Sequence, residues 1–314
     1  MPIPAAGLGY LRLLLRAETD GILMAAKRPA ALTISVPETD EFRTLLELVA
    51  AQSGPKVGIA GDDPLLRQDI DQIVAMVAEL PGIGDVAMTT CGLGLAGRVE
   101  SLAQAGLRGI NVDLDTLKPQ RYRRGEGRKA FAKVWHGLEE AVSAGLRVKL
   151  NTVLERGYND DEVDDFVKLT EEWPIEVRFV EWNVGIDHVA PPDAFVPTWE
   201  AMASIQPPLV PHDSREDGGP AIVLTVPGHK GAIGFIPNLT EHLCNNCERI
   251  GLTDSGEIVS CVFGHGLDLL RHLRGPGGAG SVTAFVDRVM RRKSSLAAKL
   301  GAWESPTVSA TAAR

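Results

Sequence analysis

Three cysteines in the last quarter of the chain have the types and spacing of metal ligands. Cys244 and Cys247 form a C-x2-C pair, and Cys261 follows after thirteen intervening residues. A C-x2-C turn presents two thiolates on one side, where they can hold one metal ion or one edge of a cluster. Residues 252–259 predict a hairpin that turns at Asp254–Gly256 and brings Cys261 back beside the pair. The sequence therefore predicts a metal site in this segment.

The number of thiolates allows two kinds of site. A structural zinc ion takes four protein ligands, and His242 or His265 could supply the fourth. A four-iron cluster held by three thiolates keeps one iron open for another ligand. The spacing alone leaves both alternatives open. The fourth cysteine, Cys91, stands apart and is interpreted as a buried free thiol.

The composition narrows the class of protein. The chain has 314 residues, 44% of them apolar, and a net charge of −9, so it is a globular protein with a substantial core. An acidic chain is a poor candidate for general binding of nucleic acids or anionic membranes. No apolar run is long enough to span a membrane. We predict a cytosolic protein, in which cysteines serve as metal ligands or core thiols more often than as disulfides.

The elements that must position these residues alternate between strand and helix. Short runs rich in Val, Ile and Leu predict strands at residues 11–15, 56–60, 85–89, 109–114, 147–154, 176–182, 222–226 and 232–236. Stripes at helical spacing lie between them, and a basic helix is expected over residues 281–300. Such alternation predicts an α/β fold of parallel βα units, either a doubly wound sheet or a whole or partial barrel, with ligands at the carboxyl ends of the strands. Asn159 and Glu162 are expected to cap a helix.

A series of segments in a fixed order resembles the GTP 3′,8-cyclase family of molybdenum cofactor biosynthesis, which are radical S-adenosylmethionine (SAM) enzymes. The resemblance covers nearly the whole chain, and its most specific part is the cysteine segment. The segments are Pro64–Asp69, Thr89–Leu93, Ile110–Asp115, Lys149–Asn151, Arg156–Glu162, Arg178–Glu181, Gly234–Ile236, the C-x2-C pair with Arg249, and Gly256 through Cys261 to Gly264.

The resemblance implies a fold and a set of ligands. The fold would be a partial (βα)6 TIM-like barrel of the radical SAM type over residues 1–185, followed by a C-terminal α+β extension over residues 186–300. The Ser/Thr/Ala composition of residues 301–314 separately predicts a disordered tail. The extension would bind a cluster and a nucleotide. By resemblance, Cys244, Cys247 and Cys261 hold a 4Fe-4S cluster whose open iron faces GTP. Arg12, Lys149, Arg178 and Arg249 match basic positions of the family's GTP site, whereas Gly251 replaces a further arginine.

The departures from the family lie on the SAM side. Alignment of the first strand puts Thr19, Leu23 and Ala26 where the family has the three cysteines that hold its SAM-cleaving cluster. Asp62 replaces a glycine of the family's SAM-binding loop, Cys91 an asparagine, and Asp113 a serine. Leu and Ala cannot bind iron, so one C-terminal cluster is expected and SAM is not.

Four hypotheses follow. The first is a non-radical binding or accessory protein that keeps the C-terminal cluster and part of the GTP site, and that has a protein partner or forms a homo-oligomer. The second is a working GTP 3′,8-cyclase, with cluster ligands supplied from elsewhere. The third is another enzyme, in which Asp62, Asp63 and Asp113 hold a hard cation or transfer protons. The fourth is a structural zinc protein. No catalytic residue is assigned.

Overall fold

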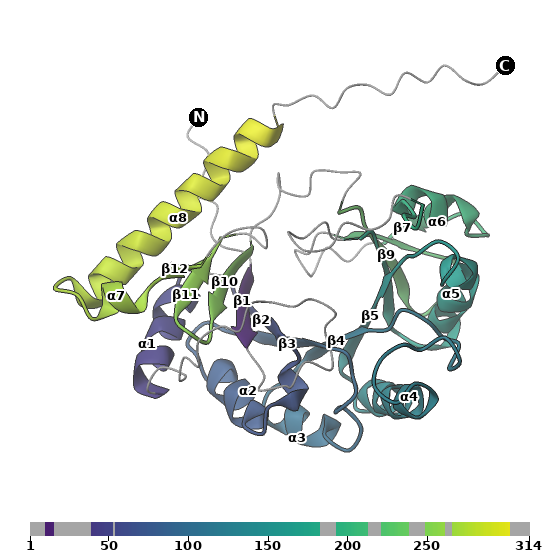
Figure 1. Ribbon diagram of the computed structural model, residues 1–314, viewed down its shortest axis with the longest axis horizontal. Coiled ribbons are helices and arrows are strands. Elements are labelled where there is room, and N and C mark those ends of the chain that lie inside the picture. The colour runs from purple at the N-terminus through teal and green to yellow at the C-terminus, as the bar shows by residue number, and fades with distance from the viewer. Residues whose placement is uncertain are drawn as a thin grey trace.

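One curved sheet with helices on its outer face forms most of the molecule (Figure 1). The computed structural model describes residues 10–15, 39–52, 54–182, 193–212, 221–238, 249–260 and 266–301, with side chains described as far as residue 292. Thr19, Leu23, Ala26, Cys244, Cys247 and Cys261 lie outside these ranges.

The first part of the chain alternates strand and helix, as predicted. Its strands are β1 (Tyr10–Leu15), β2 (Lys56–Gly61), β3 (Asp85–Thr90), β4 (Gly109–Asp113), β5 (Arg147–Val153) and β6 (Glu176–Val180). Its helices are α1 (Thr39–Ala50), the 3-10 turn η1 (Pro64–Leu66), α2 (Ile70–Ala78), α3 (Val99–Gln104), α4 (Arg128–Ser143), the 3-10 turn η2 (Asp160–Glu162) and α5 (Val163–Glu172).

The order of the strands decides between the two predicted architectures. Strands β1 to β6 are parallel and lie side by side in the order of the sequence. A doubly wound sheet reverses direction at a switch point, whereas an arc that keeps the order of the chain, with helices on one face, is a partial barrel. The helices α1 to α5 line the convex side of the arc in Figure 1.

Alternation along the strands separates an apolar face from a polar one. In β1, Leu11, Leu13 and Leu15 are buried and join the core under the helices, whereas Tyr10 and Arg12 are only partly buried. Successive side chains of a strand point to opposite faces. The polar residues of the arc are therefore on its concave face.

The remaining elements extend the same sheet at both ends. They are α6 (Thr198–Ser204), β7 (Val210–Pro211), β8 (Ile222–Thr225), β9 (Ala232–Ile236), β10 (Arg249–Thr253), β11 (Glu257–Val259), β12 (Leu267–Asp268), α7 (Leu270–Leu273) and α8 (Gly278–Gly301). Strand β9 pairs in parallel with β6, and β10 pairs in parallel with β1. The strands of the described residues run in the order β12-β11-β10-β1-β2-β3-β4-β5-β6-β9-β8-β7.

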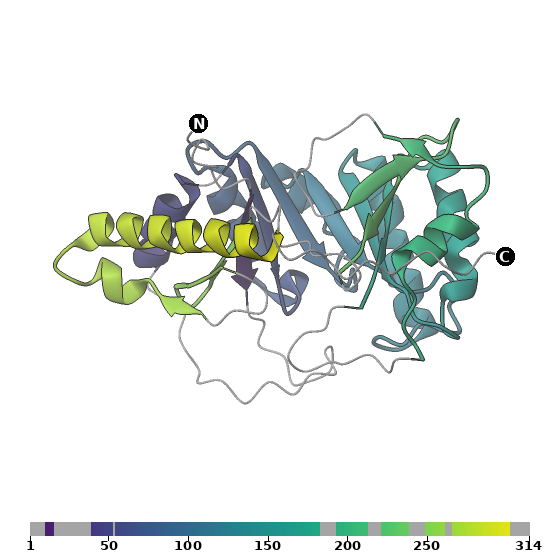
Figure 2. The same ribbon diagram turned by 90° about the horizontal axis from the view of Figure 1, so that it is seen from above.

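Two predictions for the C-terminal region are confirmed. Strands β10 and β11 form the antiparallel hairpin, which turns through Gly256 at a positive φ of 77°. The basic helix is α8, which packs against α1 and α7 and lies beside the β12 end of the sheet (Figures 1 and 2). In the described ranges, no helix has both the length and the apolar character needed to cross a membrane.

Candidate functional site

A layer of charged side chains lies on the concave face, near the amino-terminal ends of the strands. Each of its members is the first or third residue of its strand, and alternation puts all of them on the face opposite the helices. They are Arg12 of β1, Lys56 of β2, Asp85 of β3, Arg147 and Lys149 of β5, Glu176 and Arg178 of β6, and Arg249 of β10. Among the described residues, this layer thus contains six cations and two carboxylates, in a chain whose net charge is −9.

Each carboxylate of this layer contacts two of the cations. Glu176 lies 3.2 Å from the Nζ of Lys149 and 2.5 Å from the Nε of Arg178. Asp85 forms an ion pair with Arg147 and lies 4.0 Å from the Nζ of Lys56. The side chains of Lys149, Glu176 and Arg178 are all less than 15% exposed, so their charges are screened weakly by water.

Burial and neighbouring charge alter the proton affinities in this layer. Burial, followed by the repulsion of Arg178, lowers the pKa of Lys149 to about 8. Burial opposes ionisation of Glu176, but Arg178 and Lys149 outweigh it and hold the pKa of that carboxyl below its usual value. The layer therefore keeps a surplus of positive charge at neutral pH, which suits an anionic ligand with several negative charges.

The four basic residues selected from the sequence lie within this layer. Arg12 pairs with Gly58 of β2 and with Gly251 of β10, neither of which has a side chain. Arg249 begins β10 and pairs with Tyr10, the first residue of β1. Arg178 and Lys149 share Glu176. The structure gathers these residues on one face, at the amino-terminal ends of the strands, although the fold class predicts ligands at the carboxyl ends.

Sequence reasoning missed Lys56, Asp85, Arg147 and Glu176. All four are the first residues of their strands, so the period-2 alternation that identified the strands would have placed them on the polar face. The sequence does not give the register in which neighbouring strands pair. That register places Lys56 opposite Asp85 and Lys149 opposite Glu176, and so brings opposite charges together.

The opposite, carboxyl-terminal edge carries a second polar group, centred on Asp113 and Asp115. Asp113 accepts a hydrogen bond from the Nδ2 of Asn151 at 2.9 Å. Arg124 donates to the carbonyl oxygen of Asp113 at 2.9 Å and to the carboxylate of Asp115 at 3.3 Å. Burial raises the pKa of both carboxyls. Arg124 therefore offsets part of the charge of both carboxyls, and Arg123 also acts on Asp115.

The expectation that Asp62, Asp63 and Asp113 form a cation site receives no support. Asp63 is buried, and its carboxylate accepts from the hydroxyl of Thr90 at 2.7 Å, from the amide of Cys91 at 3.1 Å and from the thiol of Cys91 at 2.7 Å. These bonds hold the loop after β3 and leave Asp63 little capacity for a metal. No group of three or more His, Cys, Asp or Glu side chains in the described ranges could hold a metal ion.

Cys91 is the buried free thiol that the sequence predicts. Burial, with the adjacent charge of Asp63, raises the pKa of this thiol to about 12. It is therefore protonated at neutral pH and serves as a hydrogen-bond donor to Asp63.

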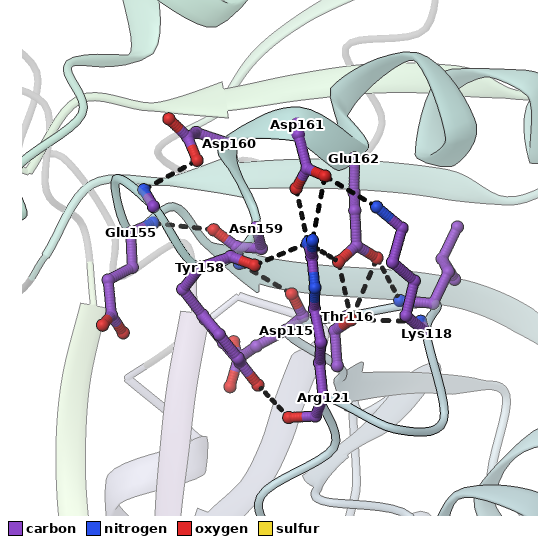
Figure 3. A network of polar contacts seen from close by, with 12 residues as sticks. Asp115, Thr116, Lys118, Arg121, Glu155, Tyr158, Asn159, Asp160, Asp161 and Glu162 are labelled. Atoms are coloured by element: carbon purple, nitrogen blue, oxygen red, sulfur yellow. Dashed lines mark hydrogen bonds and ion pairs between the residues drawn. The ribbon is translucent and has the colours of Figure 1, made fainter.

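A polar network ties the loop after β4 to the loop after β5 (Figure 3). The fully buried Glu162 accepts from the Thr116 hydroxyl at 2.8 Å, the Leu117 amide at 2.7 Å and the Arg121 guanidinium at 2.9 Å. Arg121 also donates to Asp161 at 2.5 Å. This network fixes the loops that carry Asp115 and Arg124 at the carboxyl-terminal edge.

The predicted capping roles of Asn159 and Glu162 are wrong. The Oδ1 of Asn159 accepts from the amide of Glu155 at 2.7 Å, and its Nδ2 donates to the carbonyls of Asp115 and Val153. Glu162 is turned toward the preceding βα loop instead of back to the start of its own helix. Buried partners in another loop outcompete the local cap, because a buried carboxylate needs several donors.

The predicted ligands Cys244, Cys247 and Cys261 lie outside the described residues, but the hairpin beside them is described. Cys247 precedes the start of β10 by two residues, and Cys261 follows the end of β11 by two. Because the strands are antiparallel and Gly251 pairs with Val259, the start of β10 and the end of β11 are neighbours. The geometry of the described part is thus compatible with thiolates that meet at this end of the hairpin.

Known families and structures agree with this architecture. Residues 32–170 match the family model described as Radical SAM superfamily, and residues 175–298 match Molybdenum Cofactor Synthesis C. The crystal structure of Streptococcus suis SuiB superposes with a TM-score of 0.55 at 14% identity, covering 90% of this chain and 68% of that one, which is a likeness of fold. By fold and family model, the protein is a member of the radical SAM superfamily.

Sequence relatives narrow the class further. The GTP 3′,8-cyclase of Pelotomaculum thermopropionicum is 36% identical over 270 residues, covering 84% of this chain and 83% of that protein. Molybdenum cofactor biosynthesis protein 1 of Mus musculus is 34% identical over 267 residues, or 81% of this chain and 41% of that longer protein. The chain belongs to the GTP 3′,8-cyclase family of molybdenum cofactor biosynthesis proteins.

Proposed function

We propose that the protein binds GTP on the concave face of its sheet, with the polyphosphate against the charged layer at the amino-terminal ends of the strands. The surplus of cations in that layer is the observation that carries the proposal. A polyphosphate needs several positive groups, and arginine and lysine are the side chains that bind phosphate oxygens best. Arg12, Lys149, Arg178 and Arg249 would be the main phosphate ligands.

The nucleoside would then lie toward the hairpin and its cysteines. Arg249, at the start of β10, is both a member of the charged layer and two residues from Cys247. Three thiolates suit a 4Fe-4S cluster held by Cys244, Cys247 and Cys261, which would supply an open iron as a ligand for the bound nucleotide. Zinc remains the alternative metal, and quantification of iron, zinc and acid-labile sulfide on anaerobically purified protein distinguishes the two.

Titration calorimetry with GTP at low ionic strength tests the nucleotide site. Wild-type protein should bind GTP, and Arg178→Ala should weaken binding at least about tenfold, because a charge-assisted hydrogen bond contributes about 1.5–3 kcal/mol. The matched control is Arg43→Ala, since Arg43 pairs with Glu47 on the exposed face of α1. If Arg178→Ala bound GTP as tightly as the control, the charged layer would not be the site.

Whether the protein converts GTP to a product is a second question. The names of the relatives and the positions of the cysteines point to different answers. The names of the relatives favour a working GTP 3′,8-cyclase over an accessory protein. The four cysteines of this chain are Cys91, Cys244, Cys247 and Cys261, so Thr19, Leu23 and Ala26 do not fit an iron–sulfur cluster at the superfamily's SAM-cleaving position. We therefore assign no step to SAM here, and a cyclase would need ligands from outside these three positions.

One assay separates the two proposals about turnover. Anaerobically reconstituted protein is incubated with GTP, SAM and a reductant, and 5′-deoxyadenosine and the cyclised product are quantified. Formation of both would establish the cyclase and reject the accessory role. If neither forms while GTP is bound in the calorimeter, a binding or accessory protein is the remaining function.

A further inference from the structure

Tyr10 lies on the same face as the charged layer, and neither the family resemblance nor the relatives assign it a role. It is the first residue of β1, pairs with Arg249 and shares the concave face with Arg12. Its ring crosses the neighbouring strand at Gly58. A Cβ added to Gly58 would lie 1.7 Å from the phenolic oxygen and 2.5 Å from the ring carbon that bears it. The ring can therefore lie here only because residue 58 has no side chain.

The charges around the phenol define its chemistry. Burial raises the pKa of Tyr10 above its ordinary value, although Arg12, Arg249 and Arg178 act to lower it. Asp85, the remaining charged neighbour, raises it further. The hydroxyl is therefore a neutral donor on which three cations act electrostatically, and it makes no hydrogen bond to any residue in the part of the chain that the structure describes.

We propose that the Tyr10 hydroxyl is a phosphate-binding donor, which gives a hydrogen bond to a polyphosphate oxygen of the nucleotide held by Arg12, Arg178 and Arg249. This inference rests on the proposed binding of GTP. A neutral hydroxyl adds a directed hydrogen bond without further repulsion among the cations. The ring itself packs over Gly58. The ligand class is a nucleoside polyphosphate, recognised through its phosphate chain.

Replacement of the hydroxyl alone tests the proposal. Tyr10→Phe keeps the ring over Gly58 and removes only the donor, so the thermal midpoint should stay within about 2 °C of wild type. The dissociation constant for GTP should rise about tenfold, as expected for a hydrogen bond to a charged acceptor. Tripolyphosphate, which has no nucleoside, should lose affinity by the same factor.

Tyr122→Phe is the matched control. The Tyr122 hydroxyl is buried and, like that of Tyr10, has no hydrogen-bond partner in the described ranges, but it lies on the loop after β4 near Arg124 and Cys91. Its removal should leave the affinity for GTP unchanged. Both variants lose the phenolic oxygen, so a difference between their affinities for GTP reflects where that oxygen lies in the structure and not the type of substitution.

The outcomes separate this inference from the function on which it depends. If wild-type protein binds neither GTP nor tripolyphosphate, the proposed function fails. If wild type binds both and Tyr10→Phe binds them equally well, only the role of Tyr10 is overturned. If Tyr10→Phe loses affinity for GTP but not for tripolyphosphate, Tyr10 contacts the nucleoside, and the phosphate role is again rejected.

Discussion

Glu162 and Asp161 are adjacent carboxylates that contact the same arginine, yet their surroundings are opposite. The side chain of Glu162 is fully buried, whereas that of Asp161 is 52% exposed. Replacing Glu162 with Ala leaves the Thr116 hydroxyl and the Leu117 amide without their acceptor and removes the buried carboxylate that Arg121 contacts. We predict that Glu162→Ala lowers the free energy of unfolding by about 3 kcal/mol.

Asp161→Ala is the control for this prediction. An exposed ion pair contributes little, so its loss should cost less than about 1 kcal/mol. Urea unfolding followed by circular dichroism measures both variants. Equal losses in the two variants would show that burial does not determine the strength of this network.

Lys149 should make nucleotide binding sensitive to pH. Because the pKa of Lys149 is about 8, its ammonium group loses its proton as the pH rises from 7 to 9. The phosphate groups of bound GTP then lose one positively charged partner. We predict that the affinity for GTP falls about tenfold over this range, which corresponds to 1.4 kcal/mol. Lys149→Arg, which stays protonated, should show a flatter profile, and calorimetry at a series of pH values provides the comparison.

The stability of the free protein should respond to Lys149 in the opposite direction. Its folded-state pKa is about 8, below the ordinary value of 10.5. Between these values the unfolded chain binds more protons than the folded one, so the contribution of Lys149 to stability rises with pH. Opposite trends of affinity and stability would identify the buried lysine as the titrating group.

The residues of the site could be predicted from the sequence only in part. Arg12, Lys149, Arg178 and Arg249 follow from the family resemblance, and Lys56 and Asp85 needed the strand register. The proposed role of Tyr10 could not be predicted from the sequence, because it depends on the absence of a side chain at Gly58 in the neighbouring strand. The capping prediction for Asn159 failed because its side chain bonds to the preceding loop, at Glu155 and Val153, and to Asp115 of another loop, and not to its own helix.

Strands and helices were predictable where they are long enough to show a period. The ends of β1 to β6 and of β8 and β9 differ from the predicted ranges by two residues or fewer. The two-residue strands β7 and β12 were not predicted, since two residues carry no alternation. The choice between a barrel and a doubly wound sheet required the strand order, which periodicity does not contain.

Gly61 ends β2 and must remain glycine for two reasons. Its φ is +133°, and an added Cβ would lie 1.8 Å from the carbonyl oxygen of Leu15 in the neighbouring strand. Gly82 also has a positive φ, +83°, but no atom lies within 4 Å of its added Cβ. We predict that Gly82→Ala costs about 1–2 kcal/mol of backbone strain, and that Gly61→Ala destabilises the protein clearly more.

Thermal unfolding of the two glycine variants tests this prediction. The midpoint of Gly61→Ala should fall below that of Gly82→Ala, because only the former must push β1 and β2 apart. If the two midpoints were equal, the contact between the ends of these strands would contribute nothing beyond backbone conformation.

At the scale of the whole molecule, the last strands complete the sheet that the first strands begin. Strand β10 pairs with β1, and β6, in the segment that matches the second family model, pairs with β5, in the segment that matches the first, so both segments share one hydrogen-bonded sheet. We predict one cooperative thermal transition. Near- and far-ultraviolet circular dichroism should give the same midpoint. Two separate midpoints would show that the C-terminal strands melt independently.

The pairing of β1 with β10 also has a consequence for synthesis. On the ribosome, β1 emerges early, but the strand that covers its outer edge follows only after nearly all of the sheet has been made. During that interval the nascent chain carries an unpaired edge, which is a site for aggregation and wrong pairing. Closure at such long sequence separation is slow. Production of the protein should therefore depend on chaperone capacity and on translation speed more than its final stability would suggest.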